Sequence, residues 1–160
     1  MTLYNNKPQQ RVLIGWREWT ALPELGIPSI KAKVDTGART SALHAFSVEP
    51  FLEDGIPMVR FAIHPVQHRT DKVKQCVAKV VDERWVTDSG GHREQRLVIQ
   101  TQIQMAQMMW PIELTLTNRD NMRFRMLLGR TSMENRFSIQ PDQSFVLGKP
   151  VIIEKSGTDQ

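Results

Sequence analysis

The residues best suited to chemistry are the run Asp35-Thr36-Gly37-Ala38, which follows an apolar stretch at 27–34. A strand that ends at Asp35 presents the carboxylate at its tip, where it can reach a cleft and move a proton. Gly37 lets the backbone turn sharply there, and the Thr36 hydroxyl can hydrogen-bond inward and brace the loop. A loop N–H can donate to the carboxylate and favour its ionised form. Because Asp and Gly are common turn formers, the run alone also fits an ordinary strand-ending turn.

A second stretch, Met126-Leu127-Leu128-Gly129-Arg130, lies near the C-terminal end and precedes a short helix candidate at 131–136. The two stretches together resemble the retropepsin-like aspartic peptidases. Their signature is an apolar-Asp-Thr-Gly-Ala stretch, completed by a downstream apolar-apolar-Gly-Arg stretch that packs beside it and leads into a helix.

The wider pattern is similar to a bacterial branch of that superfamily, over residues 11–147. Members of this branch are often labelled ATP-dependent zinc proteases and are associated with the glutamate ligases that modify a small-subunit ribosomal protein. The stretches that carry this resemblance are Gly15-Trp16-Arg17-Glu18-Trp19, Lys31–Ala45, Leu114–Asp120 and Met126–Thr131.

The resemblance implies a homodimeric endopeptidase with Asp35 as the catalytic carboxylate, because the mechanism needs two aspartates and a twofold axis supplies the second. Two carboxylates about 3 Å apart share one proton and activate a water between them. The active-site loop is then Thr36, Gly37, Ala38 and Arg39, supported by Leu127, Leu128, Gly129 and Arg130. The alternative is a regulatory or binding module that has the same scaffold and acts with a glutamate ligase, but does not cleave peptides.

A second aspartate within the chain is the other way to complete the pair. Asp88-Ser89-Gly90 is a variant of the triad, and Val146-Leu147-Gly148 resembles a second apolar-apolar-Gly run. However, about fifty residues per lobe are too few to bury two cores, and Thr87 breaks the apolar approach to Asp88. The run Asp88-Ser89-Gly90-Gly91 instead predicts a hairpin tip, either an ordinary surface turn or the flap that closes over substrate.

Arg39 stands where viral retropepsins carry an acidic or small residue. A cation there would favour ionised carboxylates and could select an acidic side chain of a peptide substrate; a structural salt bridge is the alternative. The distance in sequence from Asp35 to Gly129 also exceeds that of the viral enzymes. We expect the additional chain within 48–81, so the flap and the substrate cleft are expected to differ.

The remaining pattern predicts a mainly β domain, in the form of a closed, six-stranded type of retropepsin-like barrel with one short C-terminal helix. The domain is expected over residues 11–153, between disordered tails at 1–10 and 154–160. A turn is expected at 118–121 and another at 23–26. The expected strands are 11–19, 27–34, 58–63, 76–86, 96–105, 110–117, 126–128 and 145–147.

Other chemistries find little support in the sequence. The four histidines, His44, His64, His68 and His92, form no His-Glu-x-x-His pattern, and no phosphate-binding Gly-Lys-Ser/Thr loop is present, so neither zinc nor ATP is predicted as a cofactor. Cys76 lies in an apolar run and is typical of a core residue.

The composition is that of an ordinary globular protein, with 40% hydrophobic and 24% charged residues. No apolar segment is long enough to span a bilayer, no signal core precedes the domain, and one cysteine requires no oxidising compartment. These features predict a cytoplasmic protein. The net charge of +4 suits acidic partners, but we do not expect nucleic acid, because Trp16 and Trp19 are more typical of core or interface anchors.

Overall fold

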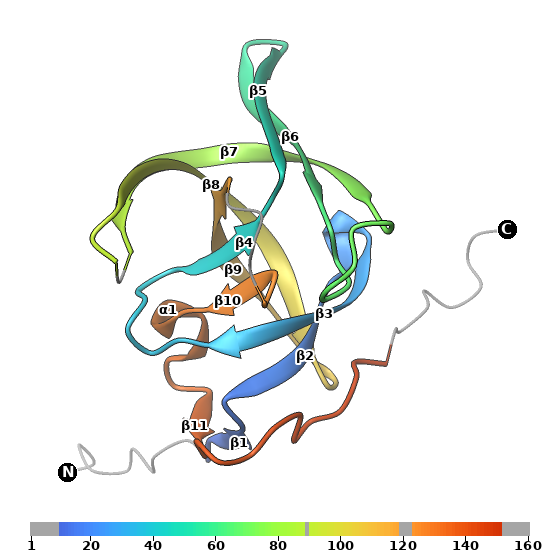
Figure 1. Cartoon of the computed structure of the whole chain (residues 1–160), viewed down its shortest axis with the longest axis vertical. Coiled ribbons are helices and arrows are strands. Elements are labelled where there is room, and N and C mark those ends of the chain that lie inside the picture. The colour runs from blue at the N-terminus through green and yellow to red at the C-terminus, as the bar shows by residue number, and fades with distance from the viewer. Residues whose placement is uncertain (1–9, 89, 119–122, 152–160) are drawn as a thin grey trace, which may run out of the picture.

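The computed structural model describes residues 10–88, 90–118 and 123–151. Within these ranges the chain is mainly β, with one short α-helix and one 3-10 helix (Figure 1). The elements are β1 (Val12–Ile14), β2 (Arg17–Leu22), η1 (Pro23–Leu25), β3 (Ile27–Val34), β4 (Ser41–His44), β5 (Ser47–Glu53), β6 (Ile56–Ile63), β7 (Lys74–Thr87), β8 (Arg93–Met105), β9 (Met108–Thr117), β10 (Met126–Leu128), α1 (Arg130–Met133) and β11 (Phe137–Ile139). No helix in these ranges is long and apolar enough to cross a membrane.

The large sheet has nine strands in the order β2-β3-β10-β4-β9-β8-β7-β6-β5. A further pairing of Ala21 with Gln104 joins β2 to β8, so β2, β3, β10, β4, β9 and β8 follow one another in a ring. In β3 the buried side chains of Ile30 and Ala32 face the core and Lys31 between them lies on the other face, whereas β2 turns the polar Glu18 and Thr20 to the buried side. Ile30, Leu43 and Leu114 are fully buried on the inner side.

The strand β10 decides where the Asp-Thr-Gly-Ala run lies. It pairs in parallel with β3, Leu128 opposite Val34, and antiparallel with β4, Leu127 opposite Ala42. The expected strands at 27–34 and 126–128 are therefore confirmed with their bounds, and the two signature stretches lie side by side.

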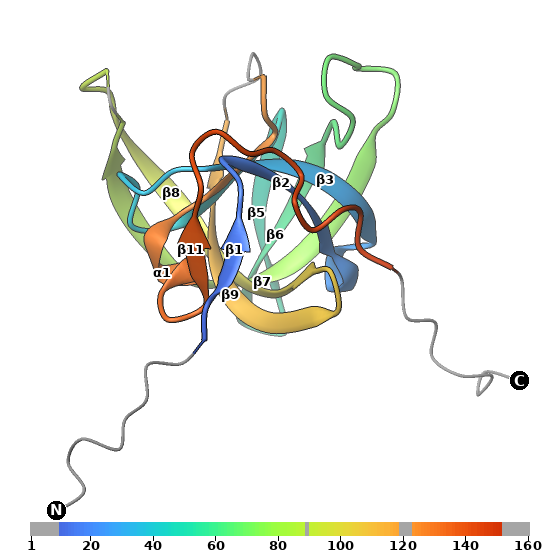
Figure 2. The ribbon, with the colours of Figure 1, turned by 90° about the horizontal axis from the view of Figure 1, so that it is seen from below.

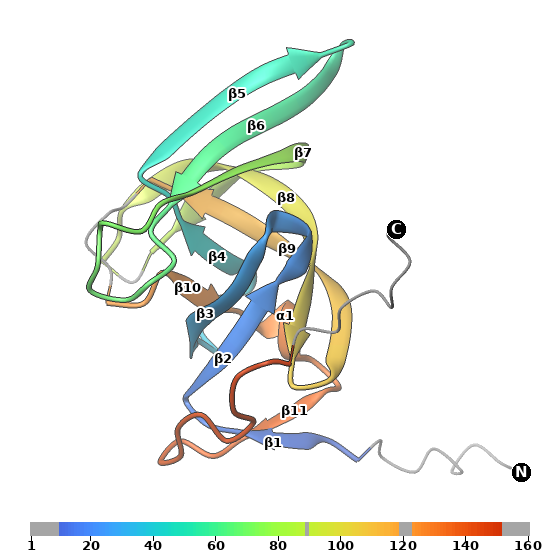
Figure 3. The same ribbon diagram turned by 90° about the vertical axis from the view of Figure 1, so that its right-hand side faces the viewer.

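The segment 48–81, where additional chain was expected, forms β5, β6 and the first half of β7. These strands continue the sheet beyond the ring, and the β5–β6 hairpin projects away from the rest of the molecule (Figure 3). The strands β4, β5 and β11 were not predicted, because β4 and β11 are short and β5 carries Pro50 in its middle, a residue that argues against a strand.

The expected strand at 11–19 is divided in two at Gly15. A side chain there would place its Cβ 2.1 Å from the carbonyl oxygen of Gln143, so only glycine fits. Val12–Ile14 pairs in parallel with β11, and both strands lie beside the C-terminal segment (Figure 2).

The expected strand at 145–147 is wrong, because its backbone is held by a side chain and not by a strand. The carboxylate of Glu18, which is fully buried, accepts hydrogen bonds from the N–H groups of Gly15 (2.7 Å), Val146 (2.9 Å) and Leu147 (3.1 Å). This one acid ties the C-terminal segment to the start of β2.

The helix expected at 131–136 begins one residue earlier and ends at Met133. Asn135 has a φ of 65°, a left-handed conformation that ends the helix. The turns at 23–26 and 88–91 are found, whereas most of the turn expected at 118–121 and the two tails lie outside the described residues.

Candidate active site

Asp35 follows directly on the last residue of β3. Its N–H donates to the carbonyl of Leu128 at 2.9 Å, which continues the parallel pairing of β3 with β10 by one residue. The position of the carboxylate is thus set by a strand far away in sequence. Asp35 is half-buried, whereas Thr36, Gly37 and Arg39 are exposed.

The turn after Asp35 is closed by the aspartate itself. Its Oδ1 accepts the N–H of Gly37 at 3.0 Å, and its carbonyl accepts the N–H of Ala38 at 3.2 Å. An amide that donates to a carboxylate stabilises the charged form. A Cβ at residue 37 would lie 3.3 Å from Oδ1, which is a tight contact, so glycine suits this position.

The start of α1 holds the other side of the loop. The backbone N–H of Arg130 donates to the Ala38 carbonyl at 2.8 Å, and its Nη1 donates to the Thr36 carbonyl at 3.0 Å. Thr131 donates to the Arg39 carbonyl from both its N–H (3.0 Å) and its hydroxyl (2.9 Å). Arg130 thus contacts the backbone of the Asp35 loop through both its N–H and its side chain.

The inward brace expected from the Thr36 hydroxyl is not formed. Thr36 is exposed, and among the described residues its contact with α1 is made by the carbonyl group and not by the side chain. The brace comes instead from Ser41, which the sequence did not single out as a supporting residue. Its hydroxyl accepts the N–H of Gly129 at 2.9 Å and lies 2.6 Å from the hydroxyl of Ser132.

Gly129 is the point of closest approach between the two signature stretches. A Cβ there would lie 2.6 Å from the carbonyl carbon of Thr40 and 2.7 Å from its oxygen. A larger residue would push the Asp35 loop away from β10. This steric limit explains why glycine stands in the apolar-apolar-Gly-Arg stretch.

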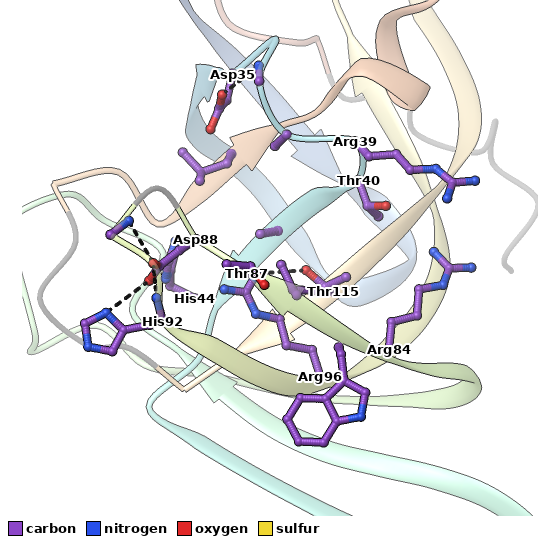
Figure 4. A pocket seen from close by; sticks show the side chains of 17 residues that line it. Asp35, Arg39, Thr40, His44, Arg84, Thr87, Asp88, His92, Arg96 and Thr115 are labelled. Carbon is purple, nitrogen blue, oxygen red and sulfur yellow. Dashed lines mark hydrogen bonds and ion pairs between the residues drawn. The ribbon is translucent and has the colours of Figure 1, made fainter.

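A cavity of about 780 Å³ opens beside Asp35 (Figure 4). Its walls come from the Asp35 loop and from the hairpin that joins β7 to β8. The lining residues are Asp35, Gly37, Ala38, Arg39, Thr40, Ala42, His44, Arg84, Trp85, Val86, Thr87, Asp88, Gly90, His92, Arg96, Thr115 and Leu127. The predicted hairpin tip therefore lines the same cavity as Asp35.

The Asp88 carboxylate is engaged in the tip itself. Its Oδ1 accepts the N–H groups of Gly90 and His92, both at 2.9 Å, and its Oδ2 lies 3.8 Å from Nδ1 of His92. Figure 4 shows Asp35 and Asp88 on different walls of the cavity. This arrangement gives Asp88 a role in holding the turn; Ser89 lies outside the described residues.

Several cavity residues had no signal in the sequence. Arg84 forms ion pairs with Asp82 (2.7 Å) and Glu113 (2.8 Å), which neutralise its charge. Arg96 is buried and donates to the Thr115 hydroxyl at 3.4 Å. Strand positions far apart in sequence supply these groups, so only sheet register brings them to the site.

The bacterial branch that the sequence resembles is often labelled as zinc proteases, but the residues present do not fit a zinc site. Among the described ranges, no group of three or more His, Cys, Asp or Glu side chains could hold a metal ion. His64 stacks on Phe46 with ring centroids 4.1 Å apart and contacts the carbonyl of Lys72, while His44 and His92 line the cavity. We therefore derive no step through a metal.

Cys76 lies in the core, as expected, 4% exposed and with its Sγ 3.6 Å from the carbonyl oxygen of Leu25. Burial raises the pKa of its thiol to about 11. At neutral pH the group is a protonated thiol and a poor nucleophile.

One known family matches nearly the whole chain. The model for "Retropepsin-like aspartic endopeptidase RimB" matches residues 13–150. The chain belongs to this RimB-like family. The match includes the Asp35 loop, the hairpin at 88–91 and the Leu128-Gly129 stretch.

Similar proteins carry the name probable alpha-L-glutamate ligase. They include proteins from Shewanella pealeana (48% identical, 87% of this chain), Desulfotalea psychrophila (46%, 86%) and Parasynechococcus marenigrum (45%, 87%). The chain spans only 30% of the length of each of these relatives. A crystal structure of a Legionella pneumophila protein of unknown function has the same fold, with a TM-score of 0.71, 23% identity, and coverage of 86% of this chain and 99% of that one.

Proposed function

We propose that the protein is an aspartic endopeptidase that acts as a homodimer, in which Asp35 pairs with Asp35 of the partner subunit. The observation that carries this proposal is the geometry of one carboxylate. Asp35 is half-buried, accepts the Gly37 N–H at 3.0 Å and lines a cavity of about 780 Å³. The turn at Thr36 and Gly37 is exposed, so a second copy can approach this loop.

The chemistry is general acid–base catalysis by two like-charged groups. Two carboxylates at close range share one proton, and they titrate as a pair. The ionised carboxylate takes a proton from a water molecule as the water oxygen attacks the scissile carbonyl, and the protonated carboxyl donates to the carbonyl oxygen. The resulting diol collapses with proton transfer to the leaving nitrogen, which breaks the C–N bond without a covalent intermediate.

The hairpin between β7 and β8 is the candidate flap. Asp88 and Gly90 of its tip line the cavity opposite the Asp35 loop, and closure of such a hairpin over a peptide would exclude water. The ring of strands would then be the closed retropepsin-like barrel that positions both walls.

Arg39 supports a preference for acidic peptides. It lines the cavity and is exposed, and no ion pair of its side chain is found among the described residues. Its charge is therefore available to a substrate carboxylate. The structural salt bridge considered for this residue has no partner in those ranges.

A second candidate is a non-cleaving regulatory module that acts with a glutamate ligase in the cytoplasm. The observation that favours it is the similarity to proteins named probable alpha-L-glutamate ligase, of which this chain matches 30% of the length. A module that is part of a ligase chain in some relatives could bind a separate ligase here.

Replacing Asp35 with Asn separates the two candidates. We expect D35N to abolish cleavage of a proteome-derived peptide library, read by mass spectrometry, while unfolding in urea as the wild type does. The matched control is D54N, because Asp54 is an exposed acid in the β5–β6 turn whose φ of 53° asparagine also adopts. Cleavage by D35N would overturn the peptidase proposal. If D35N still changes the activity of a glutamate ligase as the wild type does, the regulatory module is favoured.

The homodimer has its own test. Analytical ultracentrifugation across a concentration series should show a monomer–dimer equilibrium, and specific activity should rise with the dimer fraction. Full activity in a strictly monomeric sample would contradict the shared catalytic pair.

A further inference from the structure

The floor of the cavity is one face of the large sheet. Leu127, Ala42 and Thr115 line the cavity and are neighbours in register across β10, β4 and β9. The same row continues in the other direction, because Leu127 is paired with Lys33 of β3, and Lys33 with Arg17 of β2. Paired residues point to the same face of a sheet. Lys33 and Arg17 therefore extend this face beyond the catalytic loop.

Lys33 also lies on the same side of its strand as Asp35. Ala32 between Lys31 and Lys33 is fully buried, which fixes the alternation, and Lys33 is exposed. Residues two apart on a strand are separated by about 6.6 Å. A group bound at Lys33 would thus lie about two residues of extended peptide from a bond held at Asp35.

The charges in this row are unbalanced. Arg17 and Lys33 are directly opposite one another, and like charges in that relationship destabilise a sheet. Among the described residues, neither forms an ion pair with an acid. An anion bound between them would relieve the repulsion.

Arg17 is held rigidly, which leaves Lys33 as the adaptable group. The Arg17 Nε donates to the Ser144 hydroxyl at 3.1 Å, and the Arg17 guanidinium lies 4.6 Å from the Trp16 ring and 4.9 Å from the Phe145 ring. A fixed cation keeps the local potential positive, and a lysine ammonium beside it can turn toward a ligand.

We propose that Lys33, with Arg17 behind it, is a specificity-determining residue that binds a carboxylate of the peptide beside Asp35. This site rests on the proposed peptidase function and is separate from Arg39, which lies at the other end of the Asp35 loop. It is separated from the flap strands by β10, β4 and β9. The carboxylate comes either from an acidic side chain or from the C-terminus of the peptide.

Binding to the D35N protein tests the site without any need for cleavage. The probes are fluorescein-labelled hexaglutamate and hexaglutamine, each with a free or an amidated C-terminus, measured by fluorescence anisotropy at low salt. We expect K33Q to weaken hexaglutamate binding about fivefold and added salt to remove the difference. The matched control K79Q removes an exposed strand lysine on β7 and should leave binding unchanged.

The four probes identify the source of the carboxylate. If amidated hexaglutamate retains the K33Q effect, side-chain carboxylates are bound; if only free C-termini show it, including that of hexaglutamine, the terminus is bound. Equal effects of K33Q and K79Q would overturn the site. Lys33-dependent binding together with a wild type that cleaves no library peptide would overturn the peptidase proposal and leave the carboxylate site standing.

Discussion

The hydroxyl of Ser41 lies 2.6 Å from the hydroxyl of Ser132, and together they connect the strand after the Asp35 loop to the helix after Gly129. Both side chains are buried. Ser41 also accepts the Gly129 N–H, and the neighbouring Leu128 carbonyl accepts the N–H of Asp35. The Asp35 carboxylate is thus positioned by a buried hydroxyl on the opposite side of β10.

Replacing Ser41 with Ala leaves the Gly129 N–H without its acceptor in a buried setting. We expect S41A to lower the free energy of unfolding by about 1–3 kcal/mol, measured by urea denaturation, and to lower kcat more than it raises KM. The comparison variant is S132A, which removes the shared bond but leaves the acceptor of Gly129 in place. A loss from S132A as large as that from S41A would show that the Gly129 contact is not the important one.

Glu18 should contribute to stability through its three amide partners. In E18Q, the amide group of the new side chain must face at least one N–H donor at Gly15, Val146 or Leu147. We expect a loss of about 2–4 kcal/mol in the free energy of unfolding. The exposed Glu53 supplies the control E53Q, which should change stability little; similar values for both variants would contradict this account.

Asp88 allows the flap and the single-chain pair to be told apart. In D88N the side-chain oxygen can still accept the N–H groups of Gly90 and His92, so the tip and the activity should persist; D88A removes the acceptor, and we expect kcat/KM to fall several-fold. Peptide cleavage kinetics measure both. Loss of cleavage in D88N as complete as in D88A would point to a charge-dependent role that a turn does not require.

Cys76 makes stability depend on alkaline pH. Burial raises the pKa of its thiol from 9.0 to about 11 in the folded chain, so above pH 9 the unfolded thiol ionises while the folded one stays protonated. Stability from this group is therefore complete below pH 9 and falls as the pH rises toward 11. Urea denaturation of wild type and C76A across this range should show a steeper decline for the wild type. A thiol reagent should label the native protein at neutral pH only as fast as it unfolds.

Much of the local structure around Asp35 could be predicted from the order of residues. The alternation at 27–34 and the short apolar run at 126–128 predicted β3 and β10 with their bounds, because period-two patterns are local. The Asp-Thr-Gly-Ala run predicted a carboxylate at a turn, and the turn residues at 88–91 predicted a hairpin tip.

Local pattern failed where a side chain or a distant strand determines the backbone. The apolar run at 145–147 was predicted as a strand, but its N–H groups are taken by Glu18. The Thr36 hydroxyl was expected to brace the loop. Instead, Arg130 donates to the Thr36 carbonyl and Ser41 accepts the Gly129 N–H, and both contacts join residues that only the folded chain brings together.

The sequence by itself determined the kinds of groups at the site: a carboxylate, a glycine beside it, and a second glycine after the apolar run at 126–128. Tertiary structure alone decided which other residues surround these groups. The insertion of β10 between β3 and β4 set the register that joins Lys33, Leu127, Ala42 and Thr115 on one face. Pairing between strands distant in sequence is governed by the burial of the whole inner face, and no local window of residues contains that information.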